Sequence, residues 1–163
     1  ALLTLARAVL YLLEGFKELL DNRAVDIIHP DPVGAGGLLE TKKIGDYAEE
    51  KGIPMMLHHA SSPVSLMAVV HAAAATQNFL WLEHHFVDLP WYDDLVTGIE
   101  KPIVQNGYIN VPEKPGIGIE LNEEVVRERM DRAEPRQGVN HGTGFFEPTP
   151  EWDEIRSWDR LWS

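Results

Sequence analysis

Three short apolar segments, each preceded by a stretch with the character of a helix, constrain the fold of this chain more than any other feature. They predict strands at residues 24–28, 53–57 and 79–83. Strands separated by helices of this length form right-handed βαβ units in a parallel sheet. The sequence therefore predicts an α/β fold, and the helices that accompany these strands are expected at residues 15–23, from Gly34–Gly37 to Gly52, and at 64–75.

The segments on either side of this core follow other patterns. Residues 1–13 are apolar, but they contain Arg7, are too short to span a membrane and lack the basic leader of a signal peptide, so we expect an amphipathic or buried helix. Residues 102–112 predict a hairpin around Asn106 and Gly107. A short strand and a polar helix beginning near Asn122 are expected within residues 118–130.

The charge balance narrows the classes of partner. The 163 residues include 14 Lys and Arg against 26 Asp and Glu, a formal charge of −12. A surface of this sign opposes binding that depends on neutralising phosphates, so we expect neither a nucleic acid nor an anionic membrane as partner. The chain has no cysteine, which excludes disulfides, thiolate metal sites and a cysteine nucleophile, and which is compatible with a cytoplasmic location.

Three chemically active side chains stand at or just beyond the ends of the three predicted strands. They are Asp31, His58 and Glu83. The carboxyl ends of parallel strands form the edge where α/β proteins bind ligands and place reacting groups. An Asp beside His58 would orient the imidazole for acid/base work near neutral pH, and Glu83 would stabilise or protonate a substrate oxygen. The alternative is that His58 is only a packing residue with its hydrogen bonds satisfied.

Two pairs of adjacent histidines invite a metal interpretation. They are His58–His59 and His84–His85. Neighbouring residues on a strand point to opposite faces, so neither pair can supply two ligands to one ion without a bend. In a chain without thiolates, a zinc site would require three of these imidazoles to converge. We therefore assign no metal ligand from the sequence.

Three stretches carry a resemblance to a known family: HPDPVGAGGLLETKKIGDYAEEKGIPMMLHHASSP at 29–63, NFLWLEHH at 78–85 and PIVQNGYINVPEKPGIGIEL at 102–121. Together they resemble the C-terminal half of the mandelate racemase branch of the enolase superfamily, and within it the gluconate and galactonate dehydratases that act on acid sugars. The resemblance covers about residues 12–130.

This resemblance implies a fold and a division of the chain. The fold is the C-terminal part of a TIM-type (β/α)7β barrel, strands six to eight, with a C-terminal extension; the early strands and the capping domain are absent from the chain. Residues 1–100 would form the partial barrel with its fifth helix, and residues 101–131 a hairpin, strand and helix that complete the capping region. The composition of residues 132–163, and not the resemblance, predicts a polar tail whose tryptophans dock on a surface; the alternative is a partly ordered tail.

The resemblance also implies roles for individual residues. His58 would be the acid/base, Asp31 its orienting partner and Glu83 a hydrogen-bonding electrophilic group. Such enzymes bind Mg²⁺ to the substrate carboxylate, remove the α-proton to give an enediolate and expel the β-hydroxyl as water. The alternatives are a racemase or epimerase of the same superfamily, or a non-catalytic barrel segment with a structural role. The residues expected to contact the substrate, a sugar-acid carboxylate, are His29, His59, Trp81 and His85.

One part of the family pattern is not matched. The family's three metal ligands follow barrel strands three to five, and the position of the third falls on Ala8. A barrel of this type needs about 250 residues, and three of its strands alone would leave two unpaired edges. We therefore expect upstream polypeptide or a complementary chain to complete the barrel and to supply the metal ligands, and we expect the assembled protein to be a homo-oligomer.

Overall fold

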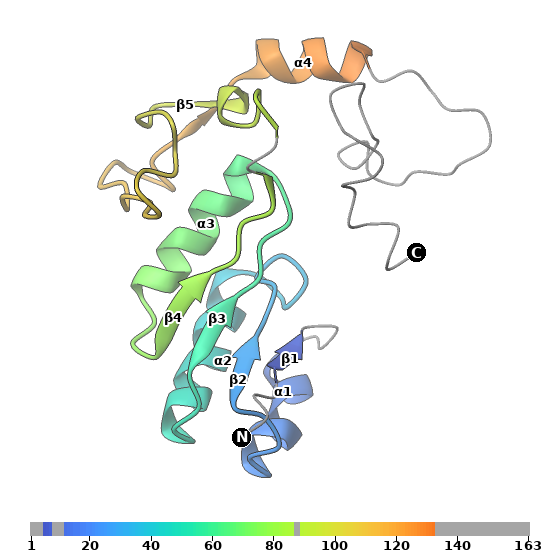
Figure 1. The fold of residues 1–163 in the computed structure, drawn as a ribbon, viewed down its shortest axis with the longest axis vertical. Coiled ribbons are helices and arrows are strands. Elements are labelled where there is room, and N and C mark those ends of the chain that lie inside the picture. Colours follow the sequence, from blue (N-terminus) through green and yellow to red (C-terminus); the bar gives the residue numbers. More distant parts are fainter. Residues whose placement is uncertain (1–4, 8–11, 87–88, 133–163) are drawn as a thin grey trace, which may run out of the picture.

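The computed structural model describes residues 5–7, 12–86 and 89–132. Within these ranges, four strands form one parallel sheet in the order β1-β2-β3-β4. Their arrows all point the same way, and the segment from β5 to α4 lies beyond their carboxyl ends (Figure 1). The strands are β1 (Leu5–Arg7), β2 (Ile27–His29), β3 (Met55–Leu57) and β4 (Phe79–Leu82), and the helices between them are α1 (Leu12–Asp21), α2 (Leu38–Glu50) and α3 (Pro63–Ala74). The predicted alternation of parallel strands and helices is confirmed.

The N-terminal segment differs from its prediction. Leu5–Arg7 form a strand and not part of a helix, and they pair with β2 in the register Leu5↔Ile27 to Arg7↔His29. The helix begins only at Leu12. A short apolar run does not reveal its period, and this one becomes a strand because the edge of β2 offers it a ladder of backbone partners. The parallel sheet thus contains one strand more than the three predicted.

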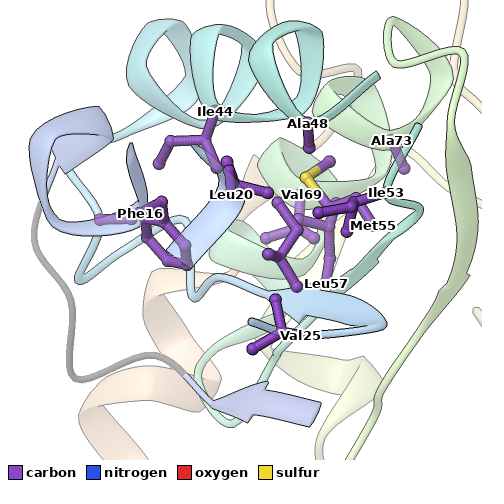
Figure 2. Packing of buried hydrophobic residues seen from close by; sticks show 12 residues of the cluster. Phe16, Leu20, Val25, Ile44, Ala48, Ile53, Met55, Leu57, Val69 and Ala73 are labelled. Atoms are coloured by element: carbon purple, nitrogen blue, oxygen red, sulfur yellow. The ribbon is translucent and has the colours of Figure 1, made fainter. Parts of the chain in front are cut away.

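The main core lies between the helices and one face of the sheet. Side chains from all three helices point toward the strands (Figure 2). They are Phe16 and Leu20 of α1, Ile44 and Ala48 of α2, and Val69 and Ala73 of α3. They meet side chains of β2 and β3 that are buried almost completely. Gly45 lets α2 approach closely, since a Cβ there would lie 2.7 Å from Thr76 Cγ2 and 3.2 Å from Met55 Cε. The strand-side members of this core are Ile28, Met55 and Leu57.

A second core covers the other side of α3. Leu66, Met67 and Val70 of α3 pack there against residues that follow β4. The nearly apolar helix predicted at residues 64–75 is therefore buried from two directions. This helix begins as predicted: the Ser62 side chain accepts the backbone N–H of Ser65, and Pro63 occupies the first turn. The residues of this second core that follow β4 are Phe86, Leu89, Tyr92, Val96 and Ile103.

The C-terminal extension follows its predicted order. After the 3₁₀ turn η2 (Asp93–Leu95), β5 (Val96–Thr97) pairs antiparallel with β6 (Glu120–Leu121), and α4 (Glu123–Arg132) follows. The turn at Asn106 and Gly107 has φ angles of 53° and 81°, and its predicted hairpin is a single bridge between Gln105 and Tyr108. Within the described ranges, no helix combines the length and the apolar character needed to cross a membrane. Ala8 and the predicted tail beyond residue 132 lie outside the described residues.

Candidate functional site

The carboxyl ends of three strands meet as the sequence predicted. Backbone hydrogen bonds continue the parallel ladder just past the strands, from His58 N–H to Pro30 C=O at 3.0 Å and from Glu83 N–H to Leu57 C=O at 2.9 Å. This ladder sets Asp31, His58 and Glu83 next to one another although 27 and 25 residues separate them along the chain. The parallel register therefore builds the candidate site.

Asp31 and His58 form a hydrogen-bonded pair. His58 Nδ1 lies 2.9 Å from Asp31 Oδ2, and Asp31 Oδ1 accepts the backbone N–H groups of Val33 at 2.8 Å and Gly34 at 3.3 Å. Partial burial alone would raise the pKa of Asp31, but the hydrogen bonds from His58, Val33 and Gly34 outweigh it and hold the pKa below its ordinary value. An ionised carboxylate can only accept, so Nδ1 of His58 carries the proton and Nε2 is the ring atom left for chemistry.

Glu83 lies among three imidazoles. Its Oε1 is 2.7 Å from His85 Nε2, and its Oε2 is 3.2 Å from His29 Nε2 and 3.7 Å from His58 Nε2. The ring centroid of His58 lies 5.6 Å from that of His29 and 5.7 Å from that of His85. About a third of the Glu83 and His85 side chains is exposed, so small molecules can reach them. We call Asp31, His29, His58, Glu83 and His85 the Glu83 cluster.

A second histidine pair points away from the Glu83 cluster. His59 is buried, its Nε2 lies 3.0 Å from Ser65 Oγ, and its ring stacks on His84 with centroids 5.8 Å apart and an interplanar angle of 24°. Burial, helped by the nearby His84, lowers the pKa of His59 to about 4, and burial also lowers the pKa of His84. Phe86 and Tyr92 stack on each other at 5.2 Å and contact the two imidazoles. We call His59, His84, Phe86 and Tyr92 the His59 cluster.

The structure thus brings together five of the seven predicted site residues. His59 lies in the other cluster, and Trp81 lies on β4 with 51% of its surface exposed, outside the ring contacts and ion pairs that define the Glu83 cluster in the described part of the chain. The substrate-binding roles predicted for His59 and Trp81 stay predictions. Sequence reasoning missed the part played by His84 and Tyr92 in packing the strand ends, although the alternation of adjacent side chains indicated that His59 would point away from His58.

The described residues do not fit a magnesium site. Mg²⁺ favours octahedral coordination by oxygen and keeps several waters, whereas the two carboxylates of the Glu83 cluster are engaged by backbone N–H groups and imidazoles. Among the residues that the structure describes, the one group of three or more donors that converges is His58, Glu83 and His85. That set is rich in nitrogen, which is not what magnesium prefers.

Comparison with known proteins points to one family. The model of the family described as enolase C-terminal domain-like matches residues 5–125. Over 120 residues the chain is 44% identical to a D-xylonate dehydratase of Haloferax volcanii, and over 113 residues it is 34% identical to an arabinonate dehydratase of Saccharolobus solfataricus. These alignments cover 74% and 69% of this chain but 29% and 30% of the relatives.

Comparison with a solved structure agrees with the family match. A mandelate racemase/muconate lactonizing enzyme-like protein from Rubrobacter xylanophilus superposes with a TM-score of 0.74 at 41% sequence identity. The superposition covers 76% of this chain and 31% of that protein. The chain therefore spans less than a third of the length of these relatives.

Proposed function

The chain belongs to the enolase C-terminal domain-like family, and from this premise we propose that it is the C-terminal portion of an acid-sugar dehydratase, a hydro-lyase that removes water from aldonic acids. The names of its relatives support this substrate class, because they include dehydratases of D-xylonate, arabinonate, D-gluconate and D-galactonate. These relatives are named for dehydration, which favours that outcome over racemisation.

The observation that carries the proposal is the Asp31–His58 pair beside Glu83. Asp31 fixes the tautomer of His58, so Nε2 faces Glu83 and can hold or release a proton as the ring changes charge. In the proposed reaction His58 Nε2, the ring atom without the proton, takes the α-proton from C2, and the electron pair of the broken C–H bond forms the enediolate. The imidazolium then gives this proton to the hydroxyl at C3, and the C3–O bond breaks as water leaves. The enol that remains tautomerises to a 2-oxo-3-deoxy acid.

Glu83 acts on the same substrate from the next strand. Its carboxyl group lies 2.7 Å from His85 Nε2 and 3.2 Å from His29 Nε2, and these contacts fix its position. We assign it, in its protonated form, to donating a hydrogen bond to the oxygen that gains charge as the α-proton leaves. His29 and His85 hold this carboxyl group in place and line the substrate's path.

The proposal also requires further strands to complete the barrel on both sides of the described sheet. β1 and β4 are the outer strands of the described sheet, and β4 exposes Leu80 and Trp81 by 45% and 51%. Such edges require partners, which we assign to upstream polypeptide or a complementary chain within a homo-oligomer. The family resemblance implies Mg²⁺ bound to the substrate carboxylate, with ligands from outside the described residues.

The test uses the assembled barrel with Mg²⁺ and a panel of four aldonic acids, D-xylonate, arabinonate, D-gluconate and D-galactonate. We expect at least one to give a 2-oxo acid, detected as its semicarbazone, and His58→Asn to abolish the product. Exchange of the C2 hydrogen with solvent deuterium without a 2-oxo acid would indicate a racemase or epimerase. A folded assembly that turns over none of the panel, or a His58→Asn variant of full activity, contradicts the proposal.

A further inference from the structure

The strand ends place three metal-binding side chains around one point. One donor atom each from His58, Glu83 and His85 lies within 4.8 Å of the others. Glu83 Oε1 lies 2.7 Å from His85 Nε2, and Glu83 Oε2 lies 3.7 Å from His58 Nε2. Side chains alternate along the strands, so only one histidine of each adjacent pair lies on the same side as Glu83. These two histidines are His58 and His85.

The spacing suits a transition metal. Tetrahedral Zn²⁺ with bonds of about 2.0–2.2 Å to nitrogen and oxygen holds neighbouring donors about 3.4 Å apart. All three donor atoms lie within 4.8 Å of one another, so no separation in the trio exceeds the ideal of about 3.4 Å by more than about 1.4 Å. Closing the trio around an ion therefore changes any of these separations by at most about 1.4 Å, which rotation of two side chains at strand ends can supply.

The residues around these three donors also favour a transition metal. Asp31 holds Nδ1 of His58 and so directs the Nε2 lone pair toward Glu83, the arrangement of a carboxylate behind a metal-binding histidine. The side chains are 13%, 31% and 30% exposed, which leaves an entry path and a fourth position for water. Two histidines and one glutamate with an open position form a donor set of catalytic zinc sites.

We propose that His58, Glu83 and His85 bind Zn²⁺ or Co²⁺ and that they do not bind Mg²⁺. The selectivity follows from the donors, because imidazole nitrogens suit zinc and cobalt, whereas magnesium takes oxygen. The bound ion occupies Nε2 of His58. It follows, resting on the proposed function, that Zn²⁺ inhibits the dehydratase by blocking the atom that moves the proton.

Direct binding tests the site without any reference to activity. Zn²⁺ is titrated into the assembled, metal-free protein against a chromophoric chelator, with Mg²⁺ in a parallel titration. We expect His85→Gln to weaken Zn²⁺ binding by at least the 10- to 100-fold typical of a lost supporting partner, and Asp31→Asn to weaken it within that range. His71→Gln is the matched control, since this α3 histidine contacts the backbone C=O of Ile117 and not the Glu83 cluster. Its Zn²⁺ affinity should equal that of the unmodified protein.

Two results overturn the site. One is equal Zn²⁺ affinity of His85→Gln and the unmodified protein; the other is displacement of Zn²⁺ by equimolar Mg²⁺. A misfolded His85→Gln variant would mimic lost binding, so X-ray absorption of the unmodified zinc complex provides a second measurement. It should count two imidazole ligands, and a shell of oxygen alone contradicts the proposal.

The inhibition is separable from the proposed function. If the assembly turns over no aldonic acid but binds Zn²⁺ through His58, Glu83 and His85, the metal site stands and the dehydratase proposal fails. If it turns over an aldonic acid and Zn²⁺ at saturating concentration leaves the rate unchanged, the dehydratase stands and the metal site fails.

Discussion

At each of two neighbouring strand ends, the two adjacent histidines lie in opposite environments. His58 and His85 surround the carboxylate of Glu83 and are partly exposed, whereas His59 and His84 stack on each other beside Phe86 and Tyr92. Each pair of neighbours comes from one strand end, so local sequence does not distinguish them. The alternation of side chains across a strand makes the difference, and it sorts one histidine of each pair into a polar cluster and the other into an apolar one.

This difference indicates a catalytic role for the Glu83 cluster and a structural role for the His59 cluster. In the Glu83 cluster carboxylates accompany the imidazoles, so a ring can gain or lose a proton while its charge stays balanced. In the His59 cluster burial disfavours the charged ring, and the pKa of His59 falls to about 4. The His59 cluster joins the segments after β3 and β4 and so holds the spacing between His58 and Glu83. Changes in the Glu83 cluster should therefore alter turnover, and changes in the His59 cluster should alter stability.

Of the variants that test this contrast, Asp31→Asn should have the largest effect. The amide oxygen can still accept the N–H groups of Val33 and Gly34, but the amide NH₂ would face Nδ1 of His58 and favour the wrong tautomer. We expect turnover of the assembled enzyme to fall about 100- to 10,000-fold, the usual contribution of acid/base catalysis, with the free energy of unfolding changed by less than about 1 kcal/mol. Steady-state kinetics and urea unfolding measure the two quantities. Turnover within about twofold of the unmodified enzyme would falsify the orienting role of Asp31.

Much of this division can be predicted from the sequence. The βα alternation placed Asp31, His58 and Glu83 at one edge, because the carboxyl ends of parallel strands must meet. The alternation places Glu83 and His85 on the same side, but the sequence could not show that their side chains form a hydrogen bond, since this depends on the path of the chain after β4. Nor could it show that Leu5–Arg7 form a strand, because only the neighbouring edge of β2 makes that conformation favourable.

His59→Ala should have an effect of intermediate size, and this effect should fall on stability instead of turnover. It removes a buried ring together with its contacts to Ser65 Oγ and His84. We expect a loss of about 2–3 kcal/mol in the free energy of unfolding, from the cavity and the lost hydrogen bond, and a turnover of the folded enzyme reduced by less than about tenfold. Urea unfolding of His59→Ala and His58→Asn, side by side, is the measurement. A His59→Ala variant of unchanged stability that loses turnover more than about 100-fold would place His59 in the chemistry, as the sequence-based substrate-binding assignment has it.

The smallest effect is expected for Tyr92→Phe, which tests the apolar character of the His59 cluster by pH. The hydroxyl of Tyr92 donates to the backbone C=O of Ser61 at 3.0 Å, so its loss should cost about 1 kcal/mol at neutral pH. Burial, together with the nearby Asp93, raises the pKa of Tyr92 above its ordinary value of 10. A folded state that keeps this proton contributes stability that is fully present below about pH 10 and is lost as the pH rises beyond it, because the unfolded chain then releases the proton first.

The loss should approach about 1.4 kcal/mol per pH unit in the unmodified protein, and Tyr92→Phe should remove that part of the slope. Urea unfolding of both proteins from about pH 8 to about pH 11 measures it, and the difference between the two curves cancels the titration of lysines and other tyrosines. The exposed Tyr108 provides the control, since Tyr108→Phe should leave the slope unchanged. If Tyr92→Phe retains the full alkaline slope, the hydroxyl already reaches water in the folded state, and the contrast between a polar and an apolar histidine cluster is weaker than the geometry indicates.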